Sequence, residues 1–181
     1  MDKKYDCIFL DRDGTINIDP GYIPDVENFK FYDYVFDALR VLSKLSKDFI
    51  IITNQSGVSR GFIKESNLIE INKFIFKNFA ENNINLLDIY CCTDHPENST
   101  IRRKPGVGMF LEASNDFNID LSNCLMIGDA LSDILPAVTL GMDSMLVLSG
   151  EGKKTVEIFD KGFKPSYIVE NILVGARKLV K

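Results

Sequence analysis

Short, continuous apolar segments recur along this chain, separated by longer amphipathic ones. The continuous segments are typical of strands buried on both faces of a sheet, and they cover residues 7–10, 49–52, 84–92, 124–127, 144–148 and, at an edge, 167–169. Apolar residues at helical spacing, or a proline suited to a first helical turn, predict helices over residues 32–47, 64–82, 105–117, 131–140 and 171–180. Because strands alternate with helices, we expect an α/β fold, a doubly wound, mainly parallel sheet with helices on both faces.

The connections between these segments predict one domain without a cap. Residues 16–32 contain two prolines and a glycine, which exclude a regular helix, and a structured loop of this length is usually functional. Residues 149–165 are rich in glycine and lysine and predict a loop with one helical turn. The connections after the first and third strands are too short for a folded cap domain. The chain shows no linker or internal repeat, so its 181 residues are expected to form a single domain, 1–181.

The first apolar segment ends in two carboxylates. Asp11 follows Leu10 directly, Asp13 comes two positions later, and Gly14 then permits a sharp turn. Residues two apart on a strand share a face, so both carboxylates can reach one space beyond the strand, where ligands bind in open α/β sheets. Two carboxylates that close repel each other unless a cation or a proton lies between them. Taken alone, this segment fits a polar turn equally well.

Three further strand ends carry polar residues. The second strand ends at Thr53-Asn54, the loop after the third closes with Arg103-Lys104, and the fourth ends at Gly128-Asp129. Each of these alone fits turn chemistry or helix capping. In a doubly wound sheet, however, such ends converge on one crevice, and four of them together favour a functional site.

This set of side chains suits phosphate chemistry. Carboxylate oxygens are typical ligands of Mg²⁺, and a lysine with a threonine hydroxyl suits phosphate oxygens. An aspartate can attack phosphorus and form an aspartyl-phosphate, while a second carboxylate protonates the leaving oxygen and later activates water. The residues therefore predict magnesium-dependent hydrolysis of a phosphate monoester.

The same segments resemble the four motifs of the haloacid dehalogenase superfamily, in the same order, over roughly residues 7–149. They are Asp11-Arg12-Asp13-Gly14-Thr15, Thr53-Asn54-Gln55, Lys104-Pro105, and Gly128-Asp129 with Asp133. The resemblance implies that Asp11 is the nucleophile and Asp13 the general acid/base, and that Thr53 and Lys104 hold the transferring phosphoryl group. It also implies Mg²⁺ on Asp11, on the Asp13 carbonyl and on Asp129, with Asp133 behind them as a candidate outer ligand. Ala130 stands where a basic residue is common in the superfamily.

Finer features are similar to the branch of phosphatases that act on heptose 1,7-bisphosphate, with histidinol-phosphate phosphatases as the closely related alternative. The resemblance rests on Asn17, on Asp19-Pro20-Gly21-Tyr22, on Gln55-Ser56-Gly57 with Arg60-Gly61, and on Arg103. It implies a small phosphorylated sugar as substrate, with Arg103 suited to a second phosphate because arginine pairs with phosphate bidentately. The expected substrate-binding residues are Asp19, Gly21, Tyr22, Asn54, Gln55, Ser56, Arg60 and Arg103.

One loop departs from that branch, which usually carries a Cys-x-His-Pro…Cys-x-Cys zinc loop. Here Cys92 is followed by Asp94, at the place of a ligand histidine, and by His95, and no cysteine follows before Arg103. One cysteine and one histidine do not complete a four-coordinate structural zinc site, so we expect no zinc.

The composition and charge of the chain limit the classes of partner that we expect. The chain is 45% hydrophobic and 26% charged, its net charge is −5, and it has no basic run, which argues against nucleic acid. No apolar segment approaches the ~18 residues of a membrane span, and no signal peptide precedes the first strand, so we expect a cytoplasmic protein without membrane contact. The cysteines are expected to be reduced, and a monomer is expected because no exposed apolar stripe forces assembly.

Two non-enzymatic interpretations remain open. A response-regulator receiver is also doubly wound, but its acceptor aspartate ends the third strand and its acidic pair is adjacent. Here the third strand ends in Cys91-Cys92, and Arg12 separates the pair. A phosphate-binding module on the same fold would keep the site residues without turnover. Failure of the protein to release phosphate from sugar phosphates in the presence of magnesium would favour either one.

Overall fold

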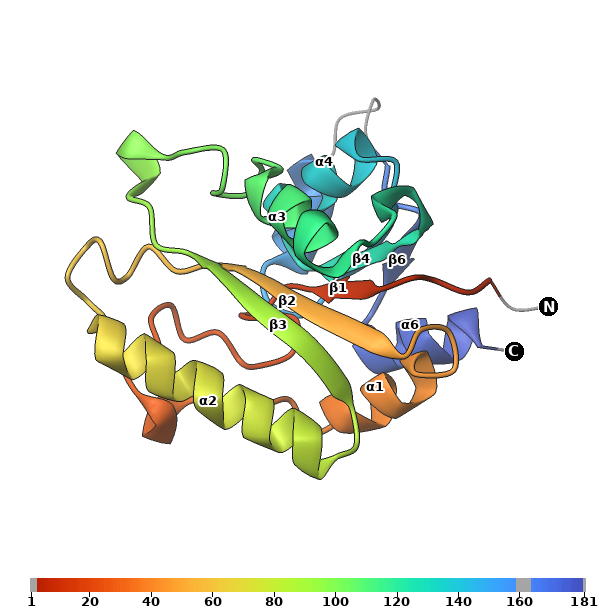
Figure 1. Cartoon of the computed structure of the whole chain (residues 1–181), viewed down its shortest axis with the longest axis horizontal. Coiled ribbons are helices and arrows are strands. Elements are labelled where there is room, and N and C mark those ends of the chain that lie inside the picture. Colours follow the sequence, from red (N-terminus) through yellow and green to blue (C-terminus); the bar gives the residue numbers. More distant parts are fainter. Residues whose placement is uncertain (1–2, 159–163, 181) are drawn as a thin grey trace.

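A computed structural model describes residues 3–158 and 164–180. All six predicted strands form and join one sheet, in the order β3-β2-β1-β4-β5-β6, and every neighbouring pair is parallel (Figure 1). The strands are β1 (Ile8–Leu10), β2 (Asp48–Asn54), β3 (Asn85–Cys92), β4 (Leu125–Gly128), β5 (Asp143–Val147) and β6 (Tyr167–Val169). The predicted doubly wound sheet is confirmed, and the strand order reverses direction at β1.

Helices cover both faces of the sheet. Figure 1 shows one group of helices below the sheet and another above it. The lower group comprises α1 (Val35–Leu42), α2 (Glu65–Glu81) and α6 (Ile172–Leu179), and the upper group comprises α3 (Gly108–Phe117) and α4 (Leu131–Thr139). The seven-residue α5 (Gly152–Ile158) follows β5. Each face therefore has its own core.

The alternation of side chains along β1 shows how the two cores are separated. Ile8 and Leu10 belong to the core between the sheet and helices α1, α2 and α6, whereas Cys7 and Phe9 belong to the core between the sheet and helices α3 and α4. The Phe9 ring lies 5.5 Å from the Phe110 ring of α3. All of β1 is buried, as expected of a central parallel strand covered on both sides.

Several predicted boundaries were wrong. The helix expected over residues 32–47 is confined to Val35–Leu42, because the chain then turns back and Leu45 N donates to Leu42 O at 2.8 Å. The helix expected from residue 105 begins at Gly108. Tight turns precede it, in which Gly106 N donates to Arg103 O at 2.7 Å. The loop expected over residues 149–165 does contain a helical segment, but α5 is longer than the one turn predicted, and residues 159–163 of the loop lie outside the described part of the chain.

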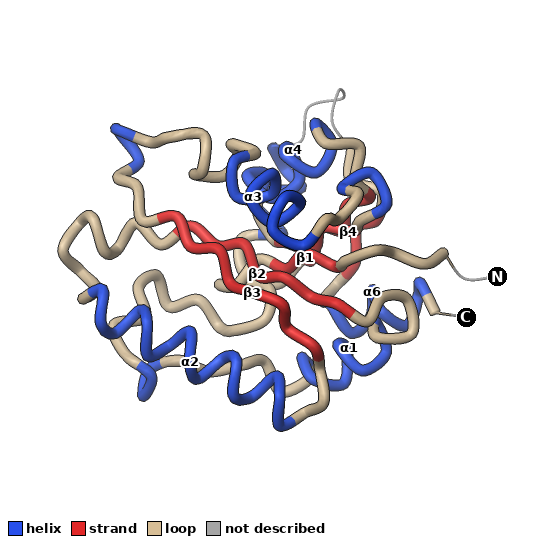
Figure 2. Tube along the Cα trace, in the orientation of Figure 1, coloured by secondary structure: helices blue, strands red, loops and turns tan. Residues whose placement is uncertain are grey.

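The loops at the carboxyl ends of the strands hold single 3₁₀ turns, η1 (Val26–Asn28) after β1 and η2 (Pro96–Asn98) after β3. Another 3₁₀ turn, η3 (Leu121–Asn123), precedes β4. Figure 2 shows the long tan segments beside that edge of the sheet. No cap domain is folded within the described loops, as predicted. None of the helices in the described ranges is both long enough and apolar enough to cross a membrane.

Candidate active site

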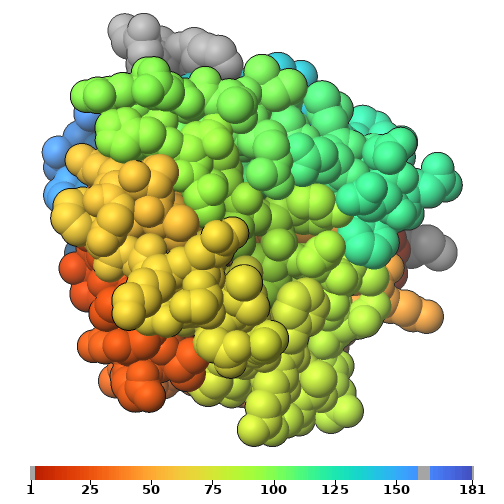
Figure 3. Space-filling view, turned by 60° about the vertical axis from the view of Figure 1, so that its left-hand side comes forward, coloured from red at the N-terminus to blue at the C-terminus, as the bar shows by residue number. Residues whose placement is uncertain are grey.

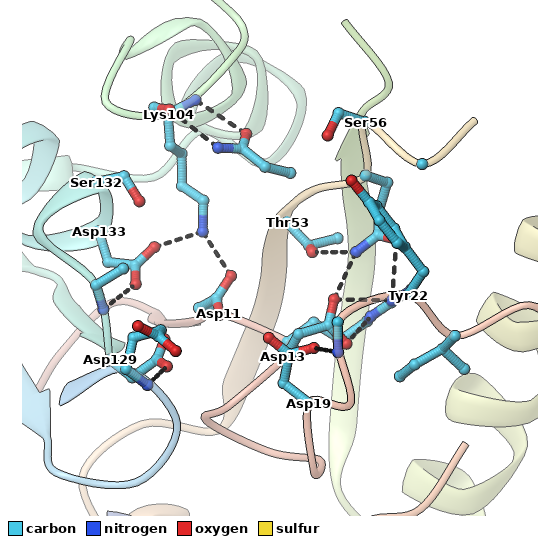
Figure 4. Close-up of a pocket in the computed structure, with 18 of the residues that line it drawn as sticks. Asp11, Asp13, Asp19, Tyr22, Thr53, Ser56, Lys104, Asp129, Ser132 and Asp133 are labelled. Carbon is cyan, nitrogen blue, oxygen red and sulfur yellow. Dashed lines mark hydrogen bonds and ion pairs between the residues drawn. The ribbon is translucent and has the colours of Figure 1, made fainter. Parts of the chain in front are cut away.

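A cavity of about 370 Å³ opens beyond the carboxyl ends of β1, β2 and β4 (Figure 4). Its lining comprises Asp11, Arg12, Asp13, Asp19, Gly21, Tyr22, Ile23, Thr53, Asn54, Gln55, Ser56, Gly57, Ile63, Lys104, Asp129, Ala130, Ser132, Asp133 and Glu151. It lies where the strand order reverses, the place at which open α/β sheets bind their ligands. The structure therefore brings the four predicted strand ends together.

Lys104 links two carboxylates at the inner end of this cavity. Its Nζ donates to Asp11 Oδ1 at 2.6 Å, to Asp133 Oδ1 at 2.5 Å and to the Ile52 carbonyl at 2.7 Å. Burial alone would lower the pKa of the Lys104 ammonium, but the Asp11 and Asp133 carboxylates raise that pKa above its usual value. Lys104 is 3% exposed and stays charged, so it supplies a positive charge that is shielded from water.

One lysine does not balance the acidic groups around it. Burial raises the pKa of Asp11 well above its usual value, and the Lys104 ammonium offsets only part of that effect. Burial and the neighbouring Asp133 charge raise the pKa of Asp129 to about 7. Both carboxylates are therefore held in a site where the positive charge of Lys104 does not balance the negative charges.

Asp11, Asp129 and Asp133 each offer one oxygen to a common centre, and these oxygens lie within 4.8 Å of one another. Three converging carboxylates are a ligand set that suits a hard divalent cation such as Mg²⁺. Both oxygens of Asp133 already have partners, because Oδ1 accepts from Lys104 and Oδ2 accepts from Ala130 N at 3.0 Å. This geometry favours Asp11 and Asp129 as direct ligands, with Asp133 behind them.

Glycines form the cradle around Asp129. Gly14 (φ +84°) and Gly150 (φ +53°) both have left-handed backbones, and a Cβ added to either would collide with Asp129 Oδ2. Ser149 Oγ donates to the Gly14 carbonyl at 2.7 Å and joins the two glycine segments. Glu151 N donates to Asp129 Oδ2 at 2.7 Å, so the carboxylate is held by backbone on two sides.

Asp13 lies in a separate network of hydrogen bonds. Its carboxylate accepts from Arg12 Nε (3.1 Å), Arg12 Nη2 (2.8 Å), Asn17 Nδ2 (2.9 Å) and Gln55 Nε2 (2.7 Å). Burial alone would raise the pKa of Asp13, but the Arg12 charge and these hydrogen bonds together hold the pKa below its usual value. Asp13 is therefore an ionised carboxylate that is held by four hydrogen bonds.

The end of β2 contributes Thr53 and Asn54. Thr53 Oγ1 accepts from Gln55 Nε2 at 2.8 Å, within the Asp13 network. Asn54 Nδ2 donates to the Lys104 carbonyl at 2.9 Å, and Lys104 N donates to Asn54 Oδ1 at 3.0 Å. Asn54 thus uses its whole amide to fasten the lysine segment to the sheet.

The outer residues predicted from the sequence divide into two groups. Asp19, Gly21, Tyr22 and Ser56 line the cavity, whereas Arg60 and Arg103 are not part of its lining. The Arg60 guanidinium donates to the Tyr22 hydroxyl at 2.7 Å, and Arg103 Nη1 donates to the Asp94 carbonyl at 3.4 Å.

The loop at residues 92–95 closes through Asp94. Its Oδ2 accepts from both N and Oγ1 of Thr100, each at 2.7 Å. These bonds hold the loop that leads to Arg103. The absence of zinc stays a prediction.

Sequence reasoning missed Arg12, Ser132 and Glu151 as parts of the site. Arg12 is 1% exposed although it is an arginine between two aspartates. The sequence could have predicted this role, because an arginine between two aspartates of a candidate site is expected to pair with one of them. Glu151 carried no signal, since it lies in a polar loop whose place follows only from the fold.

Comparisons with known proteins identify the family. The model described as "HAD-hyrolase-like" matches residues 101–174. D-glycero-beta-D-manno-heptose-1,7-bisphosphate 7-phosphatase of Yersinia pestis is 36% identical over 159 residues, which cover 83% of this chain and 85% of the relative. The protein of the same name from Escherichia coli K12 is 38% identical and covers 83% of each chain. This chain belongs to the haloacid dehalogenase-like hydrolases.

The fold of this hydrolase agrees with a solved relative. D,D-heptose 1.7-bisphosphate phosphatase from B. bronchiseptica matches with a TM-score of 0.86 and 27% identity, and the match covers 96% of this chain and 97% of that one. That relative is described as complexed with magnesium and phosphate. The resemblance drawn from the motifs is thus confirmed at the level of the family and of the fold.

Proposed function

We propose that this hydrolase is a magnesium-dependent phosphatase that cleaves a phosphate monoester of a small sugar, D-glycero-D-manno-heptose 1,7-bisphosphate, to give the heptose 1-phosphate. One observation carries the chemistry. Lys104 and the Asp11, Asp129 and Asp133 carboxylates surround one point at the inner end of the cavity. The names of the relatives support the choice of sugar.

Asp11 attacks phosphorus in this proposal. A carboxylate oxygen of Asp11 forms a bond to phosphorus while the bond to the sugar oxygen breaks, which leaves an aspartyl-phosphate. Lys104 and Thr53 hold the non-reacting oxygens of the phosphoryl group, because both flank Asp11 at the strand ends. A water oxygen then attacks phosphorus and releases Asp11 and inorganic phosphate.

Asp13 moves the protons. Entry of a phosphate dianion places negative charge near Asp13 and raises its pKa, which favours the protonated acid. Asp13 gives that proton to the departing sugar oxygen and later takes one from the attacking water. Arg12, Asn17 and Gln55 hold the carboxylate during both steps through the four hydrogen bonds described above.

Asp11, Asp129 and the backbone carbonyl of Asp13 would hold Mg²⁺, with Asp133 behind them. The donor set fits, since it is built from oxygen and since Gly14 and Gly150 keep the space around Asp129 free of side-chain carbon. When bound, the ion supplies the positive charge that lets two anions, Asp11 and the phosphate, approach each other.

The outer part of the cavity would bind the sugar. Asp19, Gly21, Tyr22, Gln55 and Ser56 line it, and about 370 Å³ is within the range of small-molecule sites. Arg103 directly precedes Lys104 in the sequence and lies outside the cavity lining, and it would pair with the second phosphate where that group leaves the cavity.

The proposal includes one domain, residues 1–181, that works as a monomer in the cytoplasm. Its support is that all six strands join one sheet and that the described residues of one chain line the cavity. Size-exclusion chromatography with light scattering tests the monomer, and a mass twice that of the chain would contradict it.

The decisive experiment is phosphate release in the presence of Mg²⁺ from both anomers of heptose 1,7-bisphosphate, from histidinol phosphate and from a panel of sugar phosphates. We expect one heptose anomer to be preferred. Asp11→Asn is expected to abolish turnover with an unchanged circular dichroism spectrum. Preference for histidinol phosphate would replace the substrate, retained turnover in Asp11→Asn would remove the nucleophile, and no release from any compound would favour a binding module.

A further inference from the structure

One carboxylate closes the loop that connects β3 to Lys104. Asp94 Oδ2 accepts from Thr100 N and from Thr100 Oγ1, each at 2.7 Å. These two hydrogen bonds lower the pKa of Asp94, so its carboxylate is ionised at neutral pH. Thr100 in turn accepts from the residues that follow it, because Arg102 N donates to Thr100 Oγ1 at 3.2 Å and Arg103 N donates to the Thr100 carbonyl at 3.2 Å. Asp94 and Thr100 are here called the loop clamp.

Arg103 is joined to both members of the loop clamp. Its backbone N donates to the Thr100 carbonyl, and its side-chain Nη1 donates to the Asp94 carbonyl at 3.4 Å. On the other side, Lys104 N donates to Asn54 Oδ1 at 3.0 Å, at the end of β2. The half-buried Arg103 thus lies between the loop clamp and a segment that is fastened to the sheet.

The two halves of this loop are held in different ways. The later half is fixed to α3, because Gly108 N donates to the Ile101 carbonyl at 2.8 Å and Arg102 Nε donates to Glu112 Oε1 at 2.7 Å. The earlier half, residues 93–99, lies at the surface, and Figure 3 shows the surface around residue 100 in green at the top of the molecule. The hydrogen bonds of Asp94 tie this earlier half to the later one.

The side chains of this loop do not fit a metal ion. Cys92 is fully buried, and burial raises the pKa of its thiol, whereas zinc binds the thiolate. Asp94 Oδ2 is already engaged by Thr100, and His95 Nδ1 accepts from a backbone N–H of η2 at 3.3 Å. In the part of the chain that the structure describes, the only converging group of three or more such side chains is the aspartate cluster of the active site.

We propose that Asp94 is a positioning residue: with Thr100, and without a metal ion, it holds Arg103 where the guanidinium binds the second phosphate of the substrate. This inference rests on the proposed function and adds the residue that places the arginine. An arginine side chain that is already held loses less conformational freedom when it pairs with a phosphate, so the substrate binds more tightly. Asp94 acts through Arg103 and does not touch a phosphate itself.

Two variants of Asp94 and two substrates test this role. Asp94→Ala should raise KM for heptose 1,7-bisphosphate about fivefold, with kcat within about twofold of the wild type, as expected for lost hydrogen bonds to a charged group at a partly exposed site. Asp94→Asn should keep KM within about twofold, because its oxygen can still accept from Thr100. Heptose 7-phosphate lacks the second phosphate, and its KM should be unchanged in both variants. An equal rise of KM for heptose 7-phosphate would overturn the proposal.

A double-mutant cycle with Arg103→Ala tests whether Asp94 acts through the arginine. Arg103→Ala alone and combined with Asp94→Ala should have the same KM for the bisphosphate within about twofold, because Asp94 then has no guanidinium to place. A further fivefold rise, about the full effect of Asp94→Ala, would overturn the proposal. Asp120→Ala is the matched control and should leave KM unchanged. Asp120 Oδ1 accepts from Ser122 N at 3.0 Å and from Ser122 Oγ at 2.7 Å, in a similar closed turn that lies outside the cavity lining.

Proteolysis tests the loop clamp without any substrate. Trypsin cleaves after arginine, so the bonds after Arg102 and Arg103 report opening of the loop. Asp94→Ala should be cleaved there about fivefold faster than the wild type, whereas Asp94→Asn and Asp120→Ala should be cleaved at the wild-type rate. Equal rates for Asp94→Ala and the wild type would overturn the proposal. Faster cleavage of the wild type after treatment with a zinc chelator would also overturn it, since an ion would then close the loop.

Failure of the proposed function can be distinguished from failure of this inference. If another sugar bisphosphate is preferred, the kinetic comparison is made with that compound and its monophosphate. If no compound is hydrolysed, the proposed function fails, and calorimetry gives the affinity of the same variants for heptose 1,7-bisphosphate. Weaker binding by Asp94→Ala, together with faster cleavage by trypsin, then supports the inference, and unchanged binding refutes it.

Discussion

Replacing Asp129 by asparagine should stabilise the metal-free protein while it removes a metal ligand. Asp129 is 4% exposed and lies beside Asp11 and Asp133. In the folded chain its pKa is raised from the usual 3.8 to about 7, first by burial and then by the Asp133 charge. The folded state therefore keeps a proton that the unfolded chain releases between about pH 4 and pH 7. Stability is lost as the pH rises through that window, and the loss is complete above pH 7.

The size of the effect follows from the pKa difference. A rise from 3.8 to about 7 corresponds to about 4 kcal/mol of unfolding free energy at pH 8. Asparagine has nearly the same shape, and its Oδ1 can still accept from Glu151 N, now 2.7 Å from the carboxylate. A neutral acceptor is weaker than a charged one by about 1 kcal/mol. Asp129→Asn should therefore raise the unfolding free energy by about 3 kcal/mol at pH 8 and by little at pH 5.

Urea unfolding in EDTA at pH 5 and pH 8 measures this difference, and repetition with Mg²⁺ tests the ligand role. Saturating Mg²⁺ at about 100 times its Kd should stabilise the wild type by about 2.7 kcal/mol and leave Asp129→Asn unchanged. Asp143→Asn is the control, because Asp143 accepts from Lys3 and Tyr5 and its removal should not stabilise. A lower unfolding free energy for Asp129→Asn than for wild type at pH 8 in EDTA, at an equal m-value, would refute the reasoning.

Three further predictions concern the same site. Lys104→Met should lower the unfolding free energy by about 3–5 kcal/mol in urea, because it leaves the Asp11 and Asp133 carboxylates buried without their cation; a loss below about 1 kcal/mol would contradict that. Arg103→Ala should raise KM for a sugar bisphosphate more than for the matching monophosphate in steady-state kinetics, and equal changes would argue against a second-phosphate role. Gly14→Ala should weaken Mg²⁺ binding in calorimetry at least tenfold, since its Cβ would collide with Asp129 and its backbone is left-handed; unchanged affinity would show that the cradle can shift.

The sheet could be predicted because its strands are buried on both faces. Such strands are continuous apolar segments, and polar residues directly after them mark the edge where ligands bind. Asp11 and Asp129 directly follow their strands and Thr53 directly follows the apolar part of β2, so both the sheet and the inner end of the cavity could be predicted from the pattern. Helix ends were less visible. Leu45 has helical spacing, but it reaches the core from a turn after Leu42, and periodicity alone does not distinguish the two.

The pattern also left open which partner each polar group takes. Asn54 lines the cavity as expected of a substrate-binding residue, but spacing did not predict that both ends of its amide bond the Lys104 backbone. Spacing also did not predict that the Arg60 guanidinium bonds Tyr22, which lies 38 positions away. Spacing along a strand predicts the face on which a side chain lies, but not the loop that approaches it. Contacts between loops depend on how far each loop folds back, which local sequence does not encode.

The charges of the site are surrounded by the buried strand β1 and by close glycine backbones. Asp11, Asp129 and Asp133 lie close together with one buried lysine, which pairs with Asp11 and Asp133, and this arrangement disfavours the folded, metal-free chain. Such a cost persists only where the surrounding structure leaves the side chains no alternative position. The fully buried β1 and the Gly14 and Gly150 backbones supply that constraint. The residues that weaken the fold are thus the same ones that would hold the cation, and this is why a stabilising substitution at Asp129 is expected to be an inactivating one.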